Sequence, residues 1–123
     1  MIIKNIAVVS VWAPDVPKTA QFYKDVLELE MMPIPHGGRP HFRVGESIFT
    51  ILQGEPQPAQ NRVPDRFPVL AFGVDDLQPM VEKLEQAGVE LPWGIEKDRW
   101  SHWVMLHDPA GNLIEIAEIH LIE

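Results

Sequence analysis

Apolar positions in the first half of the chain follow a strand, then a helix, then two more strands. Residues 2–12 are mostly apolar and β-branched, which is typical of a strand. Asp15 predicts the start of a helix, because its carboxylate can accept a backbone N–H of the first turn. Apolar side chains then recur at helical spacing, and we expect this helix to end near Glu30. Two strands joined by a turn at Gly45 are expected at residues 41–45 and 47–53.

The second half repeats this order. Residues 69–74 predict a strand, and Asp76 predicts the start of a helix that Gly88 ends. Further strands are expected around residues 89–91, 100–107 and 113–121. Between the halves lies a polar, proline-rich segment with no apolar pattern of its own. We therefore expect module one at about residues 1–53, a linker at about 54–66 and module two at about 67–123.

The repeat predicts the fold class. Asp15 and Asp76 are 61 residues apart, and an apolar strand precedes each of them. A period of this length is too long for a solenoid and too short for two independently stable domains. The sequence therefore favours one α+β domain, residues 1–123, in which two βαβββ modules build a joint core. A ferredoxin-like α+β domain is the alternative, but it needs fewer strands than the pattern predicts.

A tight turn near the C-terminus places one carboxylate in an apolar strand. Asp108-Pro-Ala-Gly-Asn112 is typical turn sequence, because proline sets φ and glycine accepts a positive φ. The strand that follows is mostly apolar, yet it contains Glu115. Burying an unpaired charge is costly, so this side chain needs a partner, a ligand or a metal.

Composition and charge exclude several classes of protein. The chain has 123 residues, a net charge of −8 and no cysteine. Binding to a phosphate backbone needs a basic face, so the charge argues against nucleic acid as a partner. The missing cysteines exclude disulfides and thiolate zinc sites, and no apolar run is long enough for a membrane helix. Because the first residues do not resemble a signal peptide, a cytoplasmic location is expected.

Three segments carry a resemblance to a known family. They are Asp15-Val-Pro-Lys-Thr-Ala-Gln-Phe-Tyr-Lys-Asp-Val-Leu27, residues 71–77 together with 86–89, and the turn at Asp108 with the strand through Glu115. In this order they resemble the vicinal oxygen chelate superfamily, which includes glyoxalases, bleomycin-resistance proteins and extradiol dioxygenases. The resemblance implies paired βαβββ modules whose mixed sheets curve around a cleft. It also implies a homodimer.

The resemblance further implies four metal-ligand positions, one on the first and one on the last strand of each module. In this sequence those positions are Val8, Thr50, Val69 and Glu115. Zinc, nickel or iron needs three or four nitrogen, oxygen or sulfur donors, and the two valines have none. We therefore interpret the chain as a member with a degenerate metal site and no cofactor.

Strand alternation predicts which other residues face the cleft. Side chains two positions apart in a strand lie on one face of the sheet. The predicted ligand-binding residues are Ser10, Trp12, Thr50, Leu52, Trp103, Met105 and Val69, which lies on the first strand of module two. This lining is apolar and aromatic with few polar groups, which suits a small organic ligand stacked on tryptophan and oriented by Glu115.

The histidines leave alternatives open. His107 is a weaker catalytic candidate, because it either pairs with Glu115 across the hairpin or begins the turn and is solvated. His41 and His102 together with Glu115 are a hypothetical metal set, although the strand pattern does not obviously bring them together. His120 is interpreted as a terminal residue.

Three functions follow as hypotheses. The first is a metal-independent protein of the glyoxalase/bleomycin-resistance type that holds a small cationic or aromatic molecule in the cleft. The second is a cofactor-free isomerase or lyase in which Glu115 is the general base, because burial raises the pKa of a carboxylate. The third is a metal-dependent glyoxalase or dioxygenase with an altered site. We favour the first, and whether the protein is an enzyme stays open.

Overall fold

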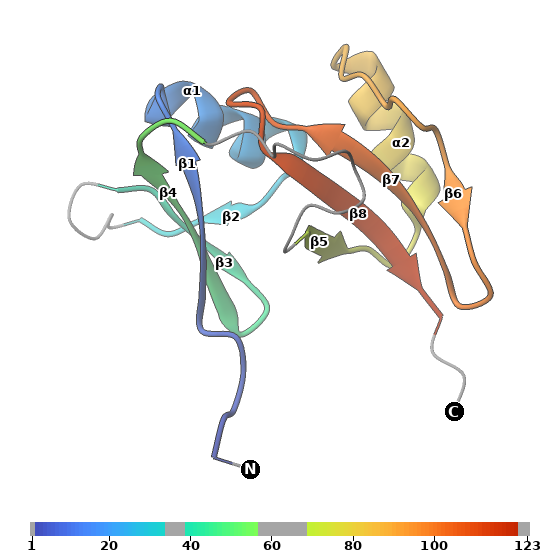
Figure 1. The fold of residues 1–123 in the computed structure, drawn as a ribbon, viewed down its shortest axis with the longest axis horizontal. Coiled ribbons are helices and arrows are strands. Elements are labelled where there is room, and N and C mark those ends of the chain that lie inside the picture. Colours follow the sequence, from blue (N-terminus) through green and yellow to red (C-terminus); the bar gives the residue numbers. More distant parts are fainter. Residues whose placement is uncertain (1, 34–38, 57–68, 121–123) are drawn as a thin grey trace. The chain divides into compact units, whose positions relative to one another are not determined.

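The chain divides into two compact units (Figure 1). The computed structural model describes residues 2–33, 39–56 and 69–120. Unit one is Met1–Pro56 and unit two is Gln57–Glu123. The boundary lies within the segment expected to be a linker, and most of that segment is outside the described residues. Each unit is described below by itself.

Unit one has one mixed sheet and one helical segment. Its elements are β1 (Val8–Ala13), α1 (Val16–Gln21), the π-helical turn η1 (Phe22–Val26), β2 (Glu30–Met31), β3 (His41–Val44) and β4 (Ser47–Gln53). The strand order is β1-β4-β3-β2, in which β1 is parallel to β4 and the other neighbours are antiparallel.

Unit two repeats this arrangement. Its elements are β5 (Leu70–Gly73), α2 (Leu77–Gln86), β6 (Glu96–Lys97), β7 (Ser101–His107) and β8 (Leu113–Ile119). The strand order is β5-β8-β7-β6, with β5 parallel to β8 and the other neighbours antiparallel. Each unit therefore has the order βαβββ, and the predicted α+β class with two such modules is confirmed.

Both helices begin where the sequence predicts. The Oδ1 atom of Asp15 accepts the N–H of Lys18 at 3.1 Å, and that of Asp76 accepts the N–H of Gln78 at 3.2 Å. Helix α2 ends at Gln86, and Gly88, with a φ of +74°, permits the closing turn. No helix in the described part of the chain is long and apolar enough to span a membrane.

The first helical segment ends earlier than predicted. It stops at Val26 rather than near Glu30, because Glu28 adopts a left-handed backbone with φ of +60°. The N–H of Leu29 then bonds to the carbonyl of Tyr23 at 3.0 Å, which closes the helix end. A glutamate at this position gives no signal in the sequence, since glycine is the usual residue there.

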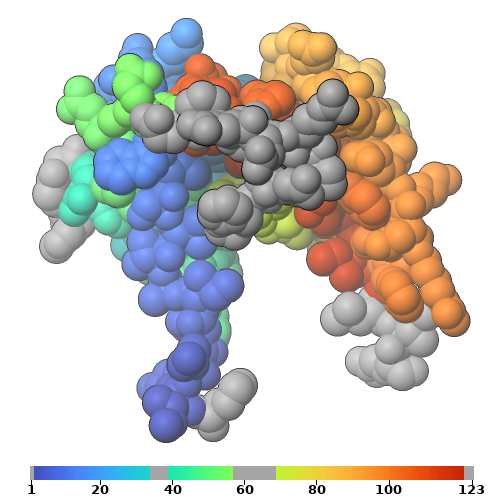
Figure 2. Space-filling view, viewed as in Figure 1, coloured from blue at the N-terminus to red at the C-terminus, as the bar shows by residue number. Residues whose placement is uncertain are grey.

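Two strand predictions also need correction. The first strand begins at Val8 and not at Ile2, because its neighbour β4 begins only at Ser47. The described residues before Val8 are exposed, as the dark blue segment of Figure 2 shows, although the carbonyls of Ile6 and Ala7 still accept bonds from β4. Residues 89–91 form no strand, and the second strand of unit two is instead β6.

One face of each sheet is covered by the helix of its own unit. In unit one, Tyr23 is fully buried and its ring centroid lies 4.6 Å from that of Phe49 on β4. In unit two, Leu77 and Leu84 of α2 are buried with a set of strand residues, namely Val104, Leu106, Ile114 and Ile116. Strand alternation leaves the opposite face of each sheet without a helix, and we call it the helix-free face.

The turn between β7 and β8 is built around a buried carboxylate. Asp108 is only 4% exposed. Its Oδ1 accepts the N–H groups of Ala110 and Asn112, and its Oδ2 accepts the side-chain amide of Asn112, each at 2.9 Å. Gly111 has a φ of +93°, which the turn requires. The turn pairs His107 with Leu113 and therefore pairs Met105 with Glu115.

Replacing Asp108 should destabilise the protein strongly. In Asp108→Ala, the partly buried N–H groups of Ala110 and Asn112 lose their side-chain acceptor, and we expect the free energy of unfolding to fall by about 2–3 kcal/mol. Urea denaturation followed by circular dichroism measures this. Asp98→Ala is the matched control, because Asp98 accepts bonds from Trp100 and Ser101 in the same way but is exposed. If the free energy of unfolding fell equally in the two variants, burial of Asp108 would not be the cause of the loss.

Candidate functional site

Glu115 lies in the middle of the helix-free face of unit two. Its neighbours across the sheet are Ala71 of β5 on one side and Met105 of β7 on the other. The residues that share this face include Ala71, Gly73, Trp103, Met105, His107, Leu113 and Ala117. Val69 directly precedes β5 and is 41% exposed. The side chains on the β5 side of Glu115 are small, so the sheet surface there is uncovered by its own unit.

No described residue forms a hydrogen bond or ion pair with Glu115. Burial raises the pKa of Glu115 above its ordinary value, and the nearby carboxylate of Glu96 raises it further. Glu96 lies opposite Trp103 in the sheet and so belongs to the same face. Sequence reasoning missed Glu96, because the short strand that carries it was expected to be a loop. The helix-free face of unit two thus combines an aromatic residue with two carboxylates.

His107 does not pair with Glu115 among the described side chains. It is exposed, and its partner across the hairpin is Leu113, whereas the partner of Glu115 is Met105. This position agrees with the alternative in which His107 begins the turn and is solvated.

The helix-free face of unit one is also apolar. It presents Val8, Ser10 and Trp12 from β1 beside Ile48, Thr50 and Leu52 from β4. Trp12 is 49% exposed, and its ring lies against the backbone at Gly54, where an added Cβ would approach Cε3 to 2.7 Å. The glycine therefore determines how close the indole can lie to the end of β4.

The strand register shows that Thr50 is the counterpart of Glu115. Thr50 pairs with Ser10, and Glu115 pairs with Ala71, which occupies the position of Ser10 in the second repeat. This agrees with the match made from the sequence. Thr50 is 4% exposed, and its hydroxyl donates a hydrogen bond to the carbonyl of Pro40 at 2.8 Å.

The four implied metal positions do not supply a metal site. Val8 and Val69 have no donor atom, and the hydroxyl of Thr50 already bonds to the backbone. Only Glu115 offers a strong ligand, while a transition metal needs three or four donors. These residues do not fit a metal ion, so we derive no chemistry through one at these positions.

In the hypothetical set of His41, His102 and Glu115, the last two side chains lie on opposite faces of one sheet. His102 pairs with Glu118, so it lies on the face of the sheet opposite to Glu115. His41 belongs to unit one, where it pairs with Thr50. His102 instead approaches Glu118 and His120, two residues that the sequence reading did not single out as a site.

Unit one also contains a groove unrelated to the predicted site. It has a volume of about 510 Å³ and lies beside α1 and β2. Its lining includes Ala20, Met31, Met32, Pro33 and Pro40. None of the residues that the sequence singles out as ligand contacts belongs to this groove.

Comparison with solved structures shows the fold. An integron cassette protein from the mobile metagenome of Vibrio cholerae is 28% identical, with a TM-score of 0.73 over 96% of this chain and 97% of that one. TnmS3, an antibiotic-binding protein from Streptomyces sp. CB03234, is 20% identical, with a TM-score of 0.77 over 97% and 98%. Lactoylglutathione lyase from Agrobacterium tumefaciens is 23% identical, with a TM-score of 0.72 over 94% of each chain.

No curated protein matches the chain. The model of the Glyoxalase/Bleomycin resistance protein/Dioxygenase superfamily matches residues 5–116. This match covers nearly the whole chain, including both βαβββ units and the turn before Glu115. The resemblance seen in the sequence is therefore confirmed, and the chain belongs to the glyoxalase/bleomycin resistance protein/dioxygenase superfamily.

Proposed function

We propose that this chain is a metal-independent binding protein for a small organic cation with an apolar or aromatic body. The observation that supports this most is Glu115, a partly buried carboxylate without a partner among the described residues. Leaving this group unpaired is unfavourable in the free protein, and an incoming cation would relieve the cost. The proposed binding surface is the helix-free face of unit two, centred on Glu115.

The composition of this face supports a cationic ligand. Trp103 offers an aromatic surface to a cation, and Glu96 and Glu115 provide two negative charges beside it. Met105 supplies an adaptable apolar contact. The net charge of −8 also favours the approach of cations over anions. Four residues of unit one remain ligand contacts predicted from strand alternation, namely Ser10, Trp12, Thr50 and Leu52.

Family membership allows both binding proteins and enzymes. One protein with this fold is described as antibiotic-binding, and another is a lactoylglutathione lyase. We favour binding, because the positions expected to hold a catalytic metal carry valine and threonine here. A homodimeric state and a cytoplasmic location remain predictions from the sequence.

A second candidate function uses the same carboxylate as a general base. The raised pKa of Glu115 favours this, since a base whose pKa is nearer neutrality accepts a proton more effectively. In that case the protein is a cofactor-free isomerase or lyase. A metal-dependent glyoxalase or dioxygenase reaction has no support from the donor atoms at Val8, Thr50 and Val69.

Ligand titration tests the binding proposal. Tryptophan fluorescence should change saturably with at least one compound from a panel of aromatic cations, antibiotics and neutral analogues, and chelator should not alter the response. Glu115→Gln should weaken binding of the cation by at least about tenfold, which corresponds to about 1.4 kcal/mol. Glu82→Gln on the exposed side of α2 makes the same change of charge and should leave the affinity unchanged. No saturable response to any compound would contradict the proposal.

The same variant separates an anchor from a base. If Glu115 is a general base, Glu115→Gln should abolish turnover of the bound compound while its dissociation constant stays within about threefold of wild type. If Glu115 is an anchor, binding itself should be lost. Measuring product formation and affinity on the same protein sample decides between them.

The raised pKa also predicts a pH-dependent stability effect. A carboxylate whose folded pKa lies above its unfolded pKa stabilises the fold when protonated, and this contribution is lost as the pH rises through the folded pKa. Glu115→Gln, which is always neutral, should therefore be more stable than wild type at pH 7. The gain should be less than about 1 kcal/mol, because solvent screens a partly exposed group.

This gain should disappear below the ordinary pKa of a glutamate, about 4.3, because wild-type Glu115 is then protonated in both the folded and the unfolded state. Urea denaturation at pH 7 and below pH 4 measures the difference. Glu82→Gln controls for the removal of a surface negative charge. An equal gain at both pH values would contradict the burial of an unpaired carboxylate.

A further inference from the structure

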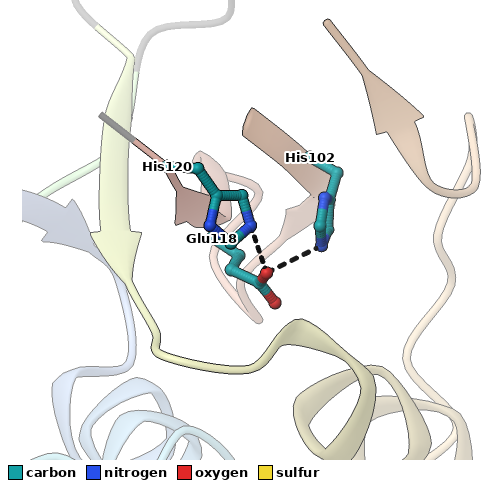
Figure 3. Close-up of side chains that lie close together, drawn as sticks. All are labelled: His102, Glu118 and His120. Carbon is teal, nitrogen blue, oxygen red and sulfur yellow. Dashed lines mark ion pairs between the residues drawn. The ribbon is translucent and has the colours of Figure 1, made fainter. Parts of the chain in front are cut away.

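Two histidines and one glutamate converge at the end of β8 in unit two (Figure 3). The Oε2 atom of Glu118 lies 3.2 Å from Nε2 of His102 and 2.5 Å from Nε2 of His120. One ligand atom from each of the three residues lies within 4.8 Å of the other two. These are the only three histidine or acidic residues in the described part of the chain that meet in this way.

The backbone holds the three residues on one face of the sheet. His102 of β7 and Glu118 of β8 are direct partners across the antiparallel ladder. The N–H of His120 bonds to the carbonyl of Trp100 at 2.6 Å, so the pairing of the two chains continues past the end of β8. Glu118 and His120 are two residues apart, and the alternation of a strand therefore points both to the same side. This side is the one that carries Ile114 and Ile116 and faces α2.

A contact with α2 fixes the orientation of the carboxylate. The other oxygen of Glu118, Oε1, accepts the N–H of Leu77, the first residue of the ten-residue helix α2, at 2.8 Å. This bond and the neighbouring histidines lower the pKa of Glu118. The side chain is 13% exposed. The N–H of Leu77 therefore holds the carboxylate through Oε1 and leaves Oε2 toward the two histidines, as second-shell contacts hold the ligands of known metal sites.

We propose that His102, Glu118 and His120 bind a late first-row divalent metal ion, with zinc as the best match. Two imidazoles and one carboxylate are donors that zinc accepts, and three protein ligands leave a fourth position for water or another ligand. Donor atoms about 2.0–2.1 Å from a tetrahedral zinc ion lie roughly 3.3 Å from one another. The distance from Glu118 to His102 already has this value, and His120 needs to retreat by less than about 1 Å.

The exposure of the two histidines favours metal entry. The side chain of His120 is 61% exposed and that of His102 is 34% exposed, so an ion reaches both without opening the core. The site lies on the opposite face of the sheet from Glu115. It therefore does not depend on the proposed ligand-binding function, and either can fail without the other.

Zinc binding by tag-free, chelator-treated protein tests this site. Equilibrium dialysis with elemental analysis should give one zinc per chain for wild type. His102→Gln, His120→Gln and Glu118→Gln should each weaken zinc binding by at least about 100-fold, because second-shell changes alone cost about 10- to 100-fold. Glu118→Gln keeps an amide oxygen for the N–H of Leu77, and His120→Gln changes an exposed side chain, so both should fold as judged by circular dichroism.

Two matched controls locate the ion. His107→Gln removes an exposed histidine from the other face of β7, and Glu115→Gln removes a carboxylate from the other face of β8. Both should keep the zinc affinity of wild type. Absence of stoichiometric zinc in wild type, or unchanged affinity in His120→Gln and Glu118→Gln, would overturn the proposal. Loss of zinc in Glu115→Gln would also overturn it, since the ion would then lie on the helix-free face.

Discussion

The register of the β7–β8 hairpin is the constraint on which both candidate sites depend. Asp108, itself buried, sets it by accepting the backbone N–H groups of Ala110 and Asn112 in the turn. Strand side chains alternate between faces, so a slip of one residue would move Glu115 to the helix-covered face and Glu118 to the opposite one. A carboxylate under the helix in place of Ile114 or Ile116 would be much less stable than the observed arrangement. The buried core and the polar turn therefore specify the same register.

The two glutamates of β8 show how the same group acquires opposite properties from its surroundings. Glu115 loses water without gaining a partner among the described residues, and its pKa rises. Glu118 gains the N–H of Leu77 and two histidines, and its pKa falls. The first carboxylate remains available to an incoming cation or proton. The second is held in one orientation, which suits a structural contact or a metal ligand.

Local patterns in the sequence predicted much of this molecule. Short-range signals predicted the helix starts at Asp15 and Asp76 and the turn at Asp108. Comparison of the two halves predicted the duplication. The structure confirms each of them. The late start of β1 depends on its distant partner β4, and the left-handed Glu28 is a residue type that gives no signal for a helix end, so no local pattern reveals either. The cluster around Glu118 was not predicted, although part of it follows from the register of the turn. Counting five residues outward from His107 and Leu113 leads to His102 and Glu118, so the turn carried enough information to pair them.

The location of the histidine cluster limits what a metal there can do. A metal held by His102, Glu118 and His120 would be separated from Glu115 by the sheet itself, because the two sets of side chains leave β7 and β8 on opposite faces. It therefore could not polarise a molecule bound at Glu115, as a metal at the family's usual positions would. Its direct effect would be to join the ends of β7 and β8 to the start of α2 through Glu118 and Leu77. Because Val8 and Val69 offer no donors, the function that we propose for Glu115 rests on its carboxylate alone, whether or not the other face binds zinc.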